Sequence, residues 1–410
     1  NYSSLIFYSL TINNILNIVV LLILAGITIS LVFSENGIIA KARESANKTN
    51  EAIINEQAQM NDVTAAMENM LNGTGGGDTP EKPKDPTENW DLSKVDPVQS
   101  TDATPVTVPV PKGYVASKVT GETTVENGFV IYEETDEVND TNKDTAQTTR
   151  NQFVWVPVAD VSEMYGTDAS GKKWGKLYSF STDGITPVNW TEQNGVMTVT
   201  TTSGSNSYRE PEVVSFDSSN SVNLTQLETQ FDSMIASVEK YGGFYIGRYE
   251  TGNLSQAETV VVKNNIDIGS QTWYTIYNKS KEVAANSNVT TTMIWGCQWD
   301  ATLRWMYNSG DSDKKTYTYN STGKGNYSGT QGSSNRIIPT GSNEQYAVNN
   351  IYDMAGNARD WTIEANNTDV RVLRGGGGGD DAVSYSTSSR NANGPSNGSN
   401  GDGSRIALYI

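Results

Sequence analysis

Closely spaced carboxylates are the side chains of this chain that could perform acid–base chemistry. Two carboxylates held at a fixed separation can act as acid and base in the cleavage of a glycosidic bond. The candidate pairs are Glu133 with Glu134, Glu210 with Glu212, and Asp311 with Asp313. None of these pairs belongs to a motif that would fix the separation, and charged side chains on solvated loops are common. We therefore predict no catalytic residue and a protein that is not an enzyme.

Histidine and cysteine usage narrows the chemistry further. The chain contains no histidine and one cysteine, Cys297. Without histidine, triads with a histidine base, histidine-ligated zinc and imidazole proton shuttles are excluded. A single cysteine excludes an intrachain disulfide. Because Cys297 lies in the aromatic stretch 293–299, we expect its thiol to be buried and inert.

Acidic residues outnumber basic ones. The 410 residues include 47 Asp and Glu against 29 Lys and Arg, which gives a net charge of -18 and a pI near 4.5. Nucleic-acid binding requires clustered Lys and Arg that neutralise phosphates, so we predict no nucleic-acid partner. The glycine run Gly375–Gly379 is followed neither by Lys-Ser/Thr nor by a helix signal, so we do not expect it to bind phosphate.

An apolar segment near the start of the chain extends from Ile15 to Phe33. At about 1.5 Å per residue, a helix of this length can cross a bilayer core of about 30 Å. The amphipathic residues 38–71 continue it without proline, so we predict one long helix over residues 1–72 that enters the membrane through residues 15–33. Residues 73–89, rich in Gly, Pro, Asp and Lys, are predicted to be a linker.

Two patterns in this N-terminal segment, Leu21–Ile29 and Glu35–Ala42, resemble the first helix of type IV pilins and pilin-like proteins. The resemblance implies that the helix first anchors the protein in the membrane and then packs in the core of a filament. Self-assembly through this helix is therefore an expectation. A plain membrane anchor is the alternative.

Residues 90–410 are predicted to form a head with short strands, two helices and extensive polar loops. Apolar residues at helical spacing predict helices over 224–241 and 298–308. The tryptophans of the head are expected to fill its core. Alternating or continuous apolar runs predict strands over five segments: 129–132, 153–158, 197–200, 243–249 and 259–262.

Three segments near the C-terminus occur in a fixed order: Gly-Asn-Ala-Arg-Asp-Trp-Thr at 356–362, Arg-Gly-Gly-Gly at 374–377, and Gly-Ser-Arg-Ile-Ala-Leu at 403–408. They resemble the Gly-Asn-Val-Trp-Glu-Trp-Thr, Arg-Gly-Gly-Ser and Gly-Phe-Arg-Val-Ala-Leu segments of the formylglycine-generating-enzyme-like branch of the C-type lectin fold. The resemblance implies an α+β fold, with the long N-terminal helix joined to a C-type lectin-like head. It also implies that a structural calcium ion could be bound, although no ligands are assigned and no other cofactor is expected.

The segment between the second and third of these motifs, residues 375–403, consists mostly of Gly, Ser, Asn and Asp. The same branch includes the variable proteins of diversity-generating retroelements, whose C-terminal codons are rewritten at template adenines. An Asn codon changed among purines at its first two bases yields Asn, Asp, Ser or Gly, so the resemblance implies a diversified ligand-binding tail. A flexible loop without a special role is the alternative. The residues predicted to face the ligand are Gly378, Gly379, Asp380, Asp381, Tyr385, Asn391, Asn393, Gly394, Asn397, Ser399, Asn400 and Asp402.

These patterns together predict a binding protein displayed on a cell surface or in a pilus-like filament. Its variable face would bind an unknown protein or glycan on another surface. One alternative is a structural filament subunit without a specific ligand. An enzyme of the formylglycine-generating type is a remote alternative, because those enzymes rely on a cysteine pair in their C-terminal part, where this chain has none.

Overall fold

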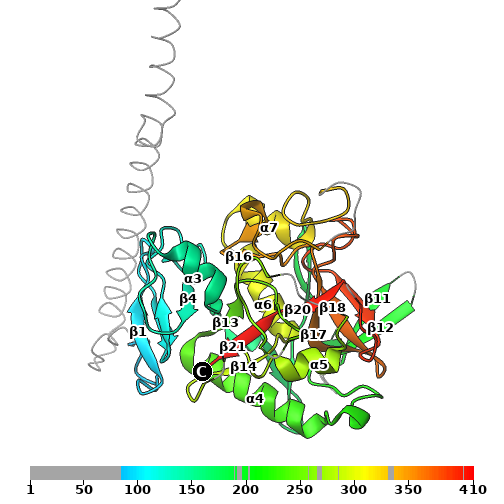
Figure 1. The fold of residues 1–410 in the computed structure, drawn as a ribbon. Coiled ribbons are helices and arrows are strands. Elements are labelled where there is room, and N and C mark those ends of the chain that lie inside the picture. The colour runs from blue at the N-terminus through cyan, green and yellow to red at the C-terminus, as the bar shows by residue number, and fades with distance from the viewer. Residues whose placement is uncertain are drawn as a thin grey trace, which may run out of the picture. The chain divides into compact units, whose positions relative to one another are not determined.

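The computed structural model describes most of the chain from Asp85 onward (Figure 1). The predicted helix over 1–72, its membrane segment 15–33 and linker residues 73–84 lie outside the described residues. No helix in the described part is long and apolar enough to span a membrane. The described ranges are 85–188, 190–191, 196–201, 204–256, 258–265, 270–284, 286–330, 337–399 and 401–410, with no side chains described between 189 and 207.

One of the two large sheets has six antiparallel strands (Figure 1). Their order is β14-β21-β13-β5-β4-β3, so the last strand of the chain pairs with two strands from its middle. The tail that precedes this last strand must therefore return to the core. The six strands are β3 (Tyr114–Ala116), β4 (Val130–Glu133), β5 (Gln152–Pro157), β13 (Gly243–Gly247), β14 (Thr290–Met293) and β21 (Ile406–Tyr409).

Both faces of this sheet are covered by apolar packing. Phe244 and Ile246 of β13 pack in one hydrophobic cluster, whereas Tyr245 between them packs in the other. The neighbouring strand β5 alternates in the same way, with Val154 on the first face and Trp155 on the second. Because side chains alternate across a strand, two cores on opposite faces explain why these strands are continuous apolar runs in the sequence.

The other large sheet has seven strands and carries the C-terminal tail (Figure 1). Its order is β10-β11-β12-β17-β18-β19, and β20 pairs in parallel with β17. These strands are β10 (Trp190–Thr191), β11 (Val196–Thr201), β12 (Gly204–Arg209), β17 (Arg359–Asn366), β18 (Val370–Arg374), β19 (Arg390–Asn393) and β20 (Asp402–Ser404). Four further pairs are β1 (Val95–Gln99) with β2 (Thr107–Pro111), β6 (Tyr165–Thr167) with β7 (Lys173–Gly175), β8 (Tyr178–Ser181) with β9 (Gly184–Pro187), and β15 (Ala347–Val348) with β16 (Ile351–Tyr352).

The described residues contain five α-helices, so the prediction of two helices in the head was wrong in number. They are α3 (Lys143–Thr149), α4 (Leu224–Tyr241), α5 (Trp273–Lys279), α6 (Gly296–Tyr307) and α7 (Ser312–Tyr319), with 3-10 turns η1 (Val161–Glu163), η2 (Ser218–Asn220) and η3 (Glu344–Tyr346). The predicted helix over 224–241 is confirmed as α4. Its start is capped by Asn223, whose side chain accepts a hydrogen bond from Gln226 N at 2.9 Å, and its end by Gly242 with a φ of 80°.

The second predicted helix, 298–308, corresponds to α6, which begins two residues earlier. The three unpredicted helices have only seven or eight residues each, too few for a clear apolar stripe. Four of the five predicted strands are confirmed as β4, β5, β11 and β13. The predicted strand over 259–262 is wrong: Val260 forms only an isolated bridge with Gly252, while the N–H of Val261 donates to the side chain of Asn151 at 2.6 Å.

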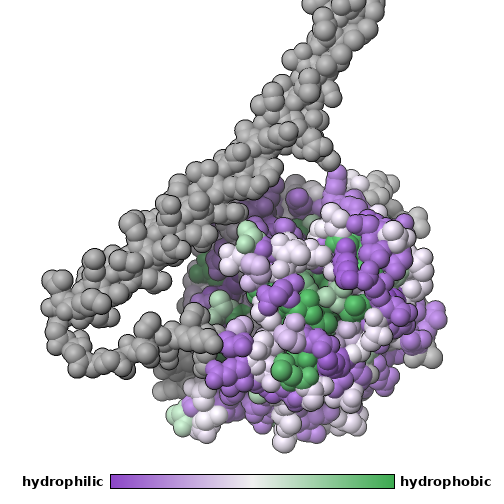
Figure 2. All heavy atoms as spheres, turned by 90° about the vertical axis from the view of Figure 1, so that its left-hand side faces the viewer, coloured by the Kyte–Doolittle hydropathy of each residue, from purple (hydrophilic) through white to green (hydrophobic). Residues whose placement is uncertain are grey.

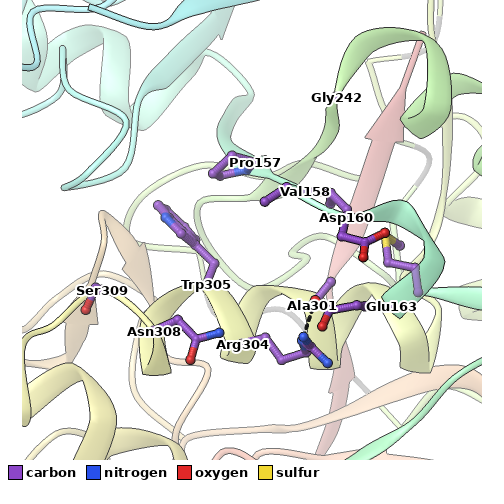
Figure 3. A pocket seen from close by; sticks show the side chains of 12 residues that line it. Pro157, Val158, Asp160, Glu163, Gly242, Ala301, Arg304, Trp305, Asn308 and Ser309 are labelled. Carbon is purple, nitrogen blue, oxygen red and sulfur yellow. Dashed lines mark ion pairs between the residues drawn. The ribbon is translucent and has the colours of Figure 1, made fainter. Parts of the chain in front are cut away.

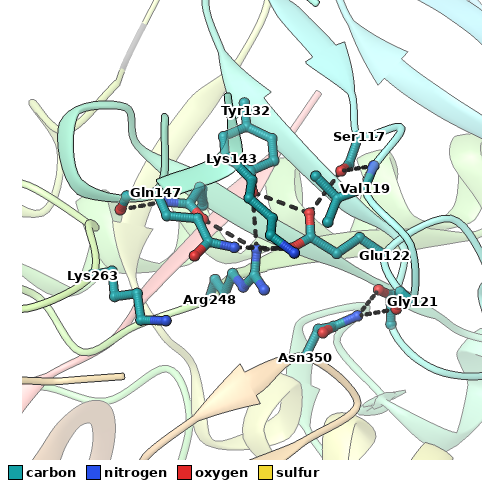
Figure 4. Close-up of polar contacts among 12 residues, drawn as sticks. Ser117, Val119, Gly121, Glu122, Tyr132, Lys143, Gln147, Arg248, Lys263 and Asn350 are labelled. Atoms are coloured by element: carbon teal, nitrogen blue, oxygen red, sulfur yellow. Dashed lines mark hydrogen bonds and ion pairs between the residues drawn. The ribbon is translucent and has the colours of Figure 1, made fainter. Parts of the chain in front are cut away.

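A buried ion pair joins the first strands of the six-stranded sheet to the segment after β13 (Figure 4). Arg248 and Glu122 lie 2.7 Å apart and are almost completely buried. Ser117, Tyr132 and Gln147 also donate hydrogen bonds to the Glu122 carboxylate, at 2.6, 3.0 and 3.1 Å. The charge of Glu122 is thus fully compensated inside the protein, as a buried ion requires.

Most tryptophans of the head lie in its core, as predicted. The buried ones are Trp155, Trp174, Trp273, Trp295, Trp299 and Trp361. Trp305 is half-buried, and the side chain of Trp190 lies outside the described residues. Figure 2 shows the face of the head on the left in Figure 1, where hydrophobic residues form small separate areas within a hydrophilic surface. The described part of the chain is therefore an α+β head with well-filled cores.

Candidate ligand-binding surface

The tail, defined here as residues 375–403, leaves and rejoins the seven-stranded sheet. It starts at the end of β18, returns as β19 beside β18, and ends as β20 beside β17. Between these strands it forms two loops, 375–389 and 394–401. The tail is therefore fixed at three places by strand pairing, and each loop runs between two fixed points.

Side chains from outside the tail hold the main chain of its first loop. The hydroxyl of Tyr327 lies 2.9 Å from the carbonyl oxygens of both Gly375 and Tyr385. The indole N–H of Trp299 donates to the carbonyl of Thr387 at 2.9 Å. Tyr327 and Trp299 are buried, so these contacts connect the loop backbone directly to the core. Such contacts do not depend on which side chains the loop carries at other positions.

A buried ionic network lies beneath β19. Arg390 donates to Glu364 at 2.8 Å and to Asp300 at 2.5 Å, and Arg374 donates to the same two carboxylates at 3.2 and 2.6 Å. Both carboxylates are inaccessible to solvent. Burial alone would lower the pKa of Arg390, but the two carboxylates outweigh it and raise that pKa above its ordinary value. Arg390 is therefore a structural residue inside the tail.

The exposed side chains of the tail bond mainly to the tail itself. Asp381 accepts hydrogen bonds from the N–H groups of Val383 and Ser384, at 2.8 and 3.1 Å. The side-chain oxygen of Asn393 accepts from Gly394 N at 2.8 Å and from the side-chain amide of Asn397 at 3.2 Å. These local bonds shape the loops without connecting them to the core, so the side chains are free to change.

Asp380, one of the predicted ligand-facing residues, forms an ion pair with a side chain outside the tail. Arg359 of β17 donates to its two carboxylate oxygens at 2.8 and 2.7 Å, and Gly377 N donates to the same carboxylate at 2.9 Å. This paired geometry places one fixed acidic group and one fixed guanidinium at the edge of the first loop. Arg359 occupies the place of the first Trp in the family segment Gly-Asn-Val-Trp-Glu-Trp-Thr, and its position beside the tail was not predicted.

The predicted ligand-facing residues differ in exposure. Gly379, Asp381, Tyr385 and Asn397 are exposed, and Asp380, Asn391, Asn393, Gly394 and Ser399 are half-buried. Asn400 lies outside the described residues. The structure therefore brings nine of the twelve positions to the surface of one continuous tail.

Gly378 and Asp402 are buried and cannot contact a ligand in this conformation, which corrects the prediction for these two residues. The N–H of Gly378 donates to Asn357 O at 2.8 Å, which draws the chain inward. Asp402 lies in β20, where it pairs with Arg359 of β17. Burial raises the pKa of Asp402 to about 6, against the attraction of Arg359. The polar type of Asp402 was therefore misleading, since its position in a strand decides its exposure.

Val383, Ser384, Ser396 and Gly398 are exposed tail residues that were not predicted, and Val383 is the one with a large hydrophobic side chain. Val383 is 57% exposed and lies in the same turn as Tyr385, which is 37% exposed; both belong to the few large hydrophobic side chains that the described head presents to solvent. Val383 is an aliphatic residue in an otherwise polar segment, and this signal in the sequence could have identified it as an apolar contact residue. Together the two side chains give the first loop an apolar contact point.

The glycines of the tail fall into two kinds. Gly375 and Gly376 have positive φ values of 84° and 71°, and a Cβ at either position would lie within 2.5 Å of a backbone oxygen. A Cβ at Gly401 would meet nothing closer than the Ser399 hydroxyl at 3.7 Å. The first kind is required by the backbone, whereas the second leaves room for a side chain.

Cys297 lies at the start of α6 and is 1% exposed, so the prediction of a buried thiol is confirmed. Glu210 accepts hydrogen bonds from Gly296 N at 2.7 Å and Cys297 N at 3.1 Å, which satisfies two donors at the N-terminus of this helix. Burial and the nearby Glu364 raise the pKa of Glu210 to about 8. Burial, followed by Glu210, raises the pKa of the Cys297 thiol well above its ordinary value, so the thiol stays protonated.

No cluster of three or more acidic or cysteine side chains suited to a metal ion occurs in the part of the chain that the structure describes. In one of the acidic pairs weighed for acid–base chemistry, Glu210 with Glu212, the two carboxylates lie in different surroundings. Glu210 is 1% exposed at the helix start, whereas the neighbouring Glu212 forms an ion pair with Arg209 at 2.7 Å. The structural calcium ion stays a prediction without assigned ligands.

Comparisons with known proteins agree with the C-terminal motifs. Residues 278–410 match the family described as the sulfatase-modifying factor enzyme 1-like domain, FGE-sulfatase. No curated protein matches the chain in sequence. The predicted resemblance to formylglycine-generating-enzyme-like domains is thus confirmed for the part that contains α6 and the tail.

Three solved structures are similar to parts of the chain. PvdO from Pseudomonas aeruginosa has 15% identity and a TM-score of 0.30, over 42% of this chain and 82% of that protein. CarF has 14% identity and a TM-score of 0.30, over 41% and 87%. Treponema denticola variable protein 1 has 14% identity and a TM-score of 0.31, over 63% of this chain and 96% of that protein.

Proposed function

We propose that this chain is a binding protein whose tail presents a changeable ligand-binding surface. The observation that carries the proposal is that the main chain and the exposed side chains of the tail have different contacts. Its main chain is held by strand pairing and by buried residues such as Tyr327 and Trp299, whereas its exposed side chains bond chiefly to each other. A fixed backbone with interchangeable side chains is the arrangement that a diversified binding surface needs.

The proposed surface combines adaptable polar groups with an apolar anchor. Asn391, Asn393 and Asn397 supply side-chain amides, and Val383 with Tyr385 supplies the apolar contact. Binding surfaces built from small polar residues around a rigid aromatic ring adapt to many partners. A protein or a glycan on another surface is the proposed ligand.

The N-terminal residues complete the proposal. We propose that the helix over 1–72 attaches the head to a membrane or a pilus-like filament, which would place the tail at the cell surface. The support is the apolar run of residues 15–33 in the sequence. Attachment by a plain membrane anchor would serve the same purpose.

A non-enzymatic role is part of the proposal. The support is the state of Cys297, which is buried, protonated and the only cysteine of the chain. A thiol that must react with a substrate needs solvent access and a lowered pKa. Oxidation of a cysteine-containing peptide by the purified protein would contradict this part of the proposal.

The proposal is tested by sequencing the DNA that encodes residues 375–410 in many cells of the source population, together with its flanks. Substitutions are expected at exposed positions such as Asn393 and Asn397, at bases that match adenines in a nearby invariant copy. They should be absent at the anchored positions Gly376, Thr387 and Arg390, because these hold the backbone.

Two other outcomes would count against a variable binding surface. Uniform sequences without a nearby copy would favour a structural filament subunit, whose tail is a fixed loop. Substitutions spread equally over anchored and exposed positions would show neutral drift instead of a maintained scaffold. In either case, changing Asn393 to Tyr should alter no binding property of the protein.

A further inference from the structure

A concave site outside the tail lies along α6 (Figure 3). It is a cavity of about 410 Å³ between the end of α6 and the segment that follows β5. Ala301, Arg304 and Trp305 of α6 line the cavity from one helix face because they are three or four residues apart, and Asn308 lines it directly after the helix. Trp299 and Asp300, which precede Arg304 in the sequence, bond to the tail from the buried part of the helix.

The aromatic ring in this cavity is available to a ligand. Trp305 is half-buried, unlike the six core tryptophans, and Figure 3 shows it reaching from α6 toward Pro157. Its indole N–H makes no hydrogen bond to any described residue. A partly exposed indole with a free donor offers both a flat apolar surface and a polar contact.

Polar groups also line the cavity. The Ser162 hydroxyl, followed by the Ser162 N–H, lowers the pKa of Asp160, so this carboxylate is ionised at neutral pH; the N–H donates to one of its oxygens at 2.9 Å. The side-chain amide of Asn308 has no hydrogen-bond partner among the described residues. Glu163 and Arg304 form an ion pair at the rim, so the two charges offset each other.

A neighbouring hollow extends the site beyond the ion pair. It also has a volume of about 410 Å³ and shares Glu163, Arg304 and Asn308 with the first cavity. Its aromatic residues are Tyr178, which is buried beneath the guanidinium of Arg304 at 4.3 Å from the ring centre, and Tyr307, which is half-buried. Tyr307 is therefore the ring of this hollow that a ligand can reach, and the two hollows meet at one row of polar side chains.

We propose that these two hollows are adjoining subsites for a neutral disaccharide unit of a glycan. Each pyranose has an apolar face that can stack on an aromatic ring, while its hydroxyl groups need carboxylates and amides as partners. The row of Glu163, Arg304 and Asn308 supplies such partners at the junction of the two rings. The volumes fall in the range of about 300–1,000 Å³ that small-ligand sites occupy.

Charge favours a neutral sugar over an acidic one. Asp160 and Glu163 carry two negative charges at the first subsite against the single positive charge of Arg304, and the whole chain has a net charge of -18. An acidic sugar would meet this unfavourable field at close range. A neutral sugar avoids the repulsion and retains every hydrogen bond.

The test is isothermal titration of the full-length protein with four neutral disaccharides: cellobiose, maltose, lactose and N,N′-diacetylchitobiose. At least one is expected to bind with a Kd of about 1 mM or tighter. Trp305→Ala should weaken that binding at least about tenfold, because it removes the stacking surface. Asn308→Ala should weaken it about fivefold through the loss of one hydrogen bond. Asn308 is exposed and follows the last residue of α6, so this variant keeps the test valid if the loss of the half-buried Trp305 ring weakens the fold.

Two control variants make the result specific. Trp90→Ala changes another half-buried tryptophan, which packs against Tyr241 at a ring distance of 5.9 Å, and should leave sugar binding unchanged. Asn393→Tyr alters the tail and should also leave it unchanged, so failure of the proposed tail function would not affect this outcome. The proposal is overturned if none of the four sugars binds at about 10 mM, if binding survives Trp305→Ala, or if digalacturonate binds more tightly than all four.

Discussion

Replacing Gly376 by Ala should damage the head, although the same change at Gly401 should not. Both glycines belong to the tail, and composition alone treats them alike. Gly376 has a φ of 71°, and its Cβ would lie 2.4 Å from Tyr385 O and 2.9 Å from Tyr385 Cβ. The Tyr385 carbonyl cannot easily retreat, because the Tyr327 hydroxyl lies 2.9 Å from it and is held by the core.

The expected cost combines two terms. An Ala in the left-handed region costs about 1–2 kcal/mol. Forcing a methyl group into a packed contact costs about 1–3 kcal/mol more. A loss of about 3 kcal/mol lowers the melting temperature by roughly 4–5 °C in a domain that covers residues 85–410. Gly401→Ala should change stability by less than about 0.5 kcal/mol, because a Cβ there meets nothing within 3.7 Å.

Thermal unfolding of both variants, followed by circular dichroism or calorimetry under one buffer condition, measures this difference. Binding of any identified ligand serves as the second readout, since Gly401→Ala should preserve the fold and still change the surface. The reasoning is refuted if the Gly376→Ala variant melts within about 2 °C of the unmodified protein. It is also refuted if Gly401→Ala lowers the melting temperature by as much as Gly376→Ala does.

Three further predictions concern groups that hold the head together. Burial raises the pKa of Glu210 to about 8, so the folded state retains a proton that the unfolded chain, with its ordinary value of 4.5, releases. The free energy of unfolding should therefore fall between about pH 5 and pH 8, and Glu210→Gln should flatten that slope in urea titrations at both pH values. Arg390→Ala leaves two inaccessible carboxylates with one arginine fewer and should cost about 3–5 kcal/mol in the same titrations. Tyr327→Phe removes the hydroxyl near Gly375 O and Tyr385 O, and should cost about 1–3 kcal/mol and speed amide hydrogen exchange in the tail.

Local patterns in the sequence predicted the elements whose determinants are local. Helix α4 was predicted at its observed bounds from its apolar stripe, and its capping residues Asn223 and Gly242 directly flank the helix in the sequence. Cys297 was predicted to be buried because aromatic residues surround it in the chain. In such segments the information that decides the structure lies within a single window of sequence.

The exposure of tail residues could not be predicted in the same way, because it depends on distant partners. Asp402 is buried since β20 pairs with β17, a contact across more than forty residues that composition does not reveal. Arg390 is polar like its neighbours in the sequence, yet its side chain forms buried ion pairs with Glu364 and Asp300. A polar, glycine-rich segment therefore contains both structural and changeable positions, and only the fold separates them.

Helix α6 connects the two sites proposed for this head and also explains why they should act independently. Its buried face is locked by Asp300 in the ionic network and by the contact from Trp299 to the tail backbone. Neither contact involves a tail side chain that we expect to vary. New side chains at Asn393 or Gly401 would therefore leave the helix in place, and the groove at Trp305 would keep its shape. Since the two surfaces share only rigid, satisfied contacts, substitutions at one should add to substitutions at the other without coupling. A head built in this way could change its tail ligand while keeping a constant affinity for a glycan.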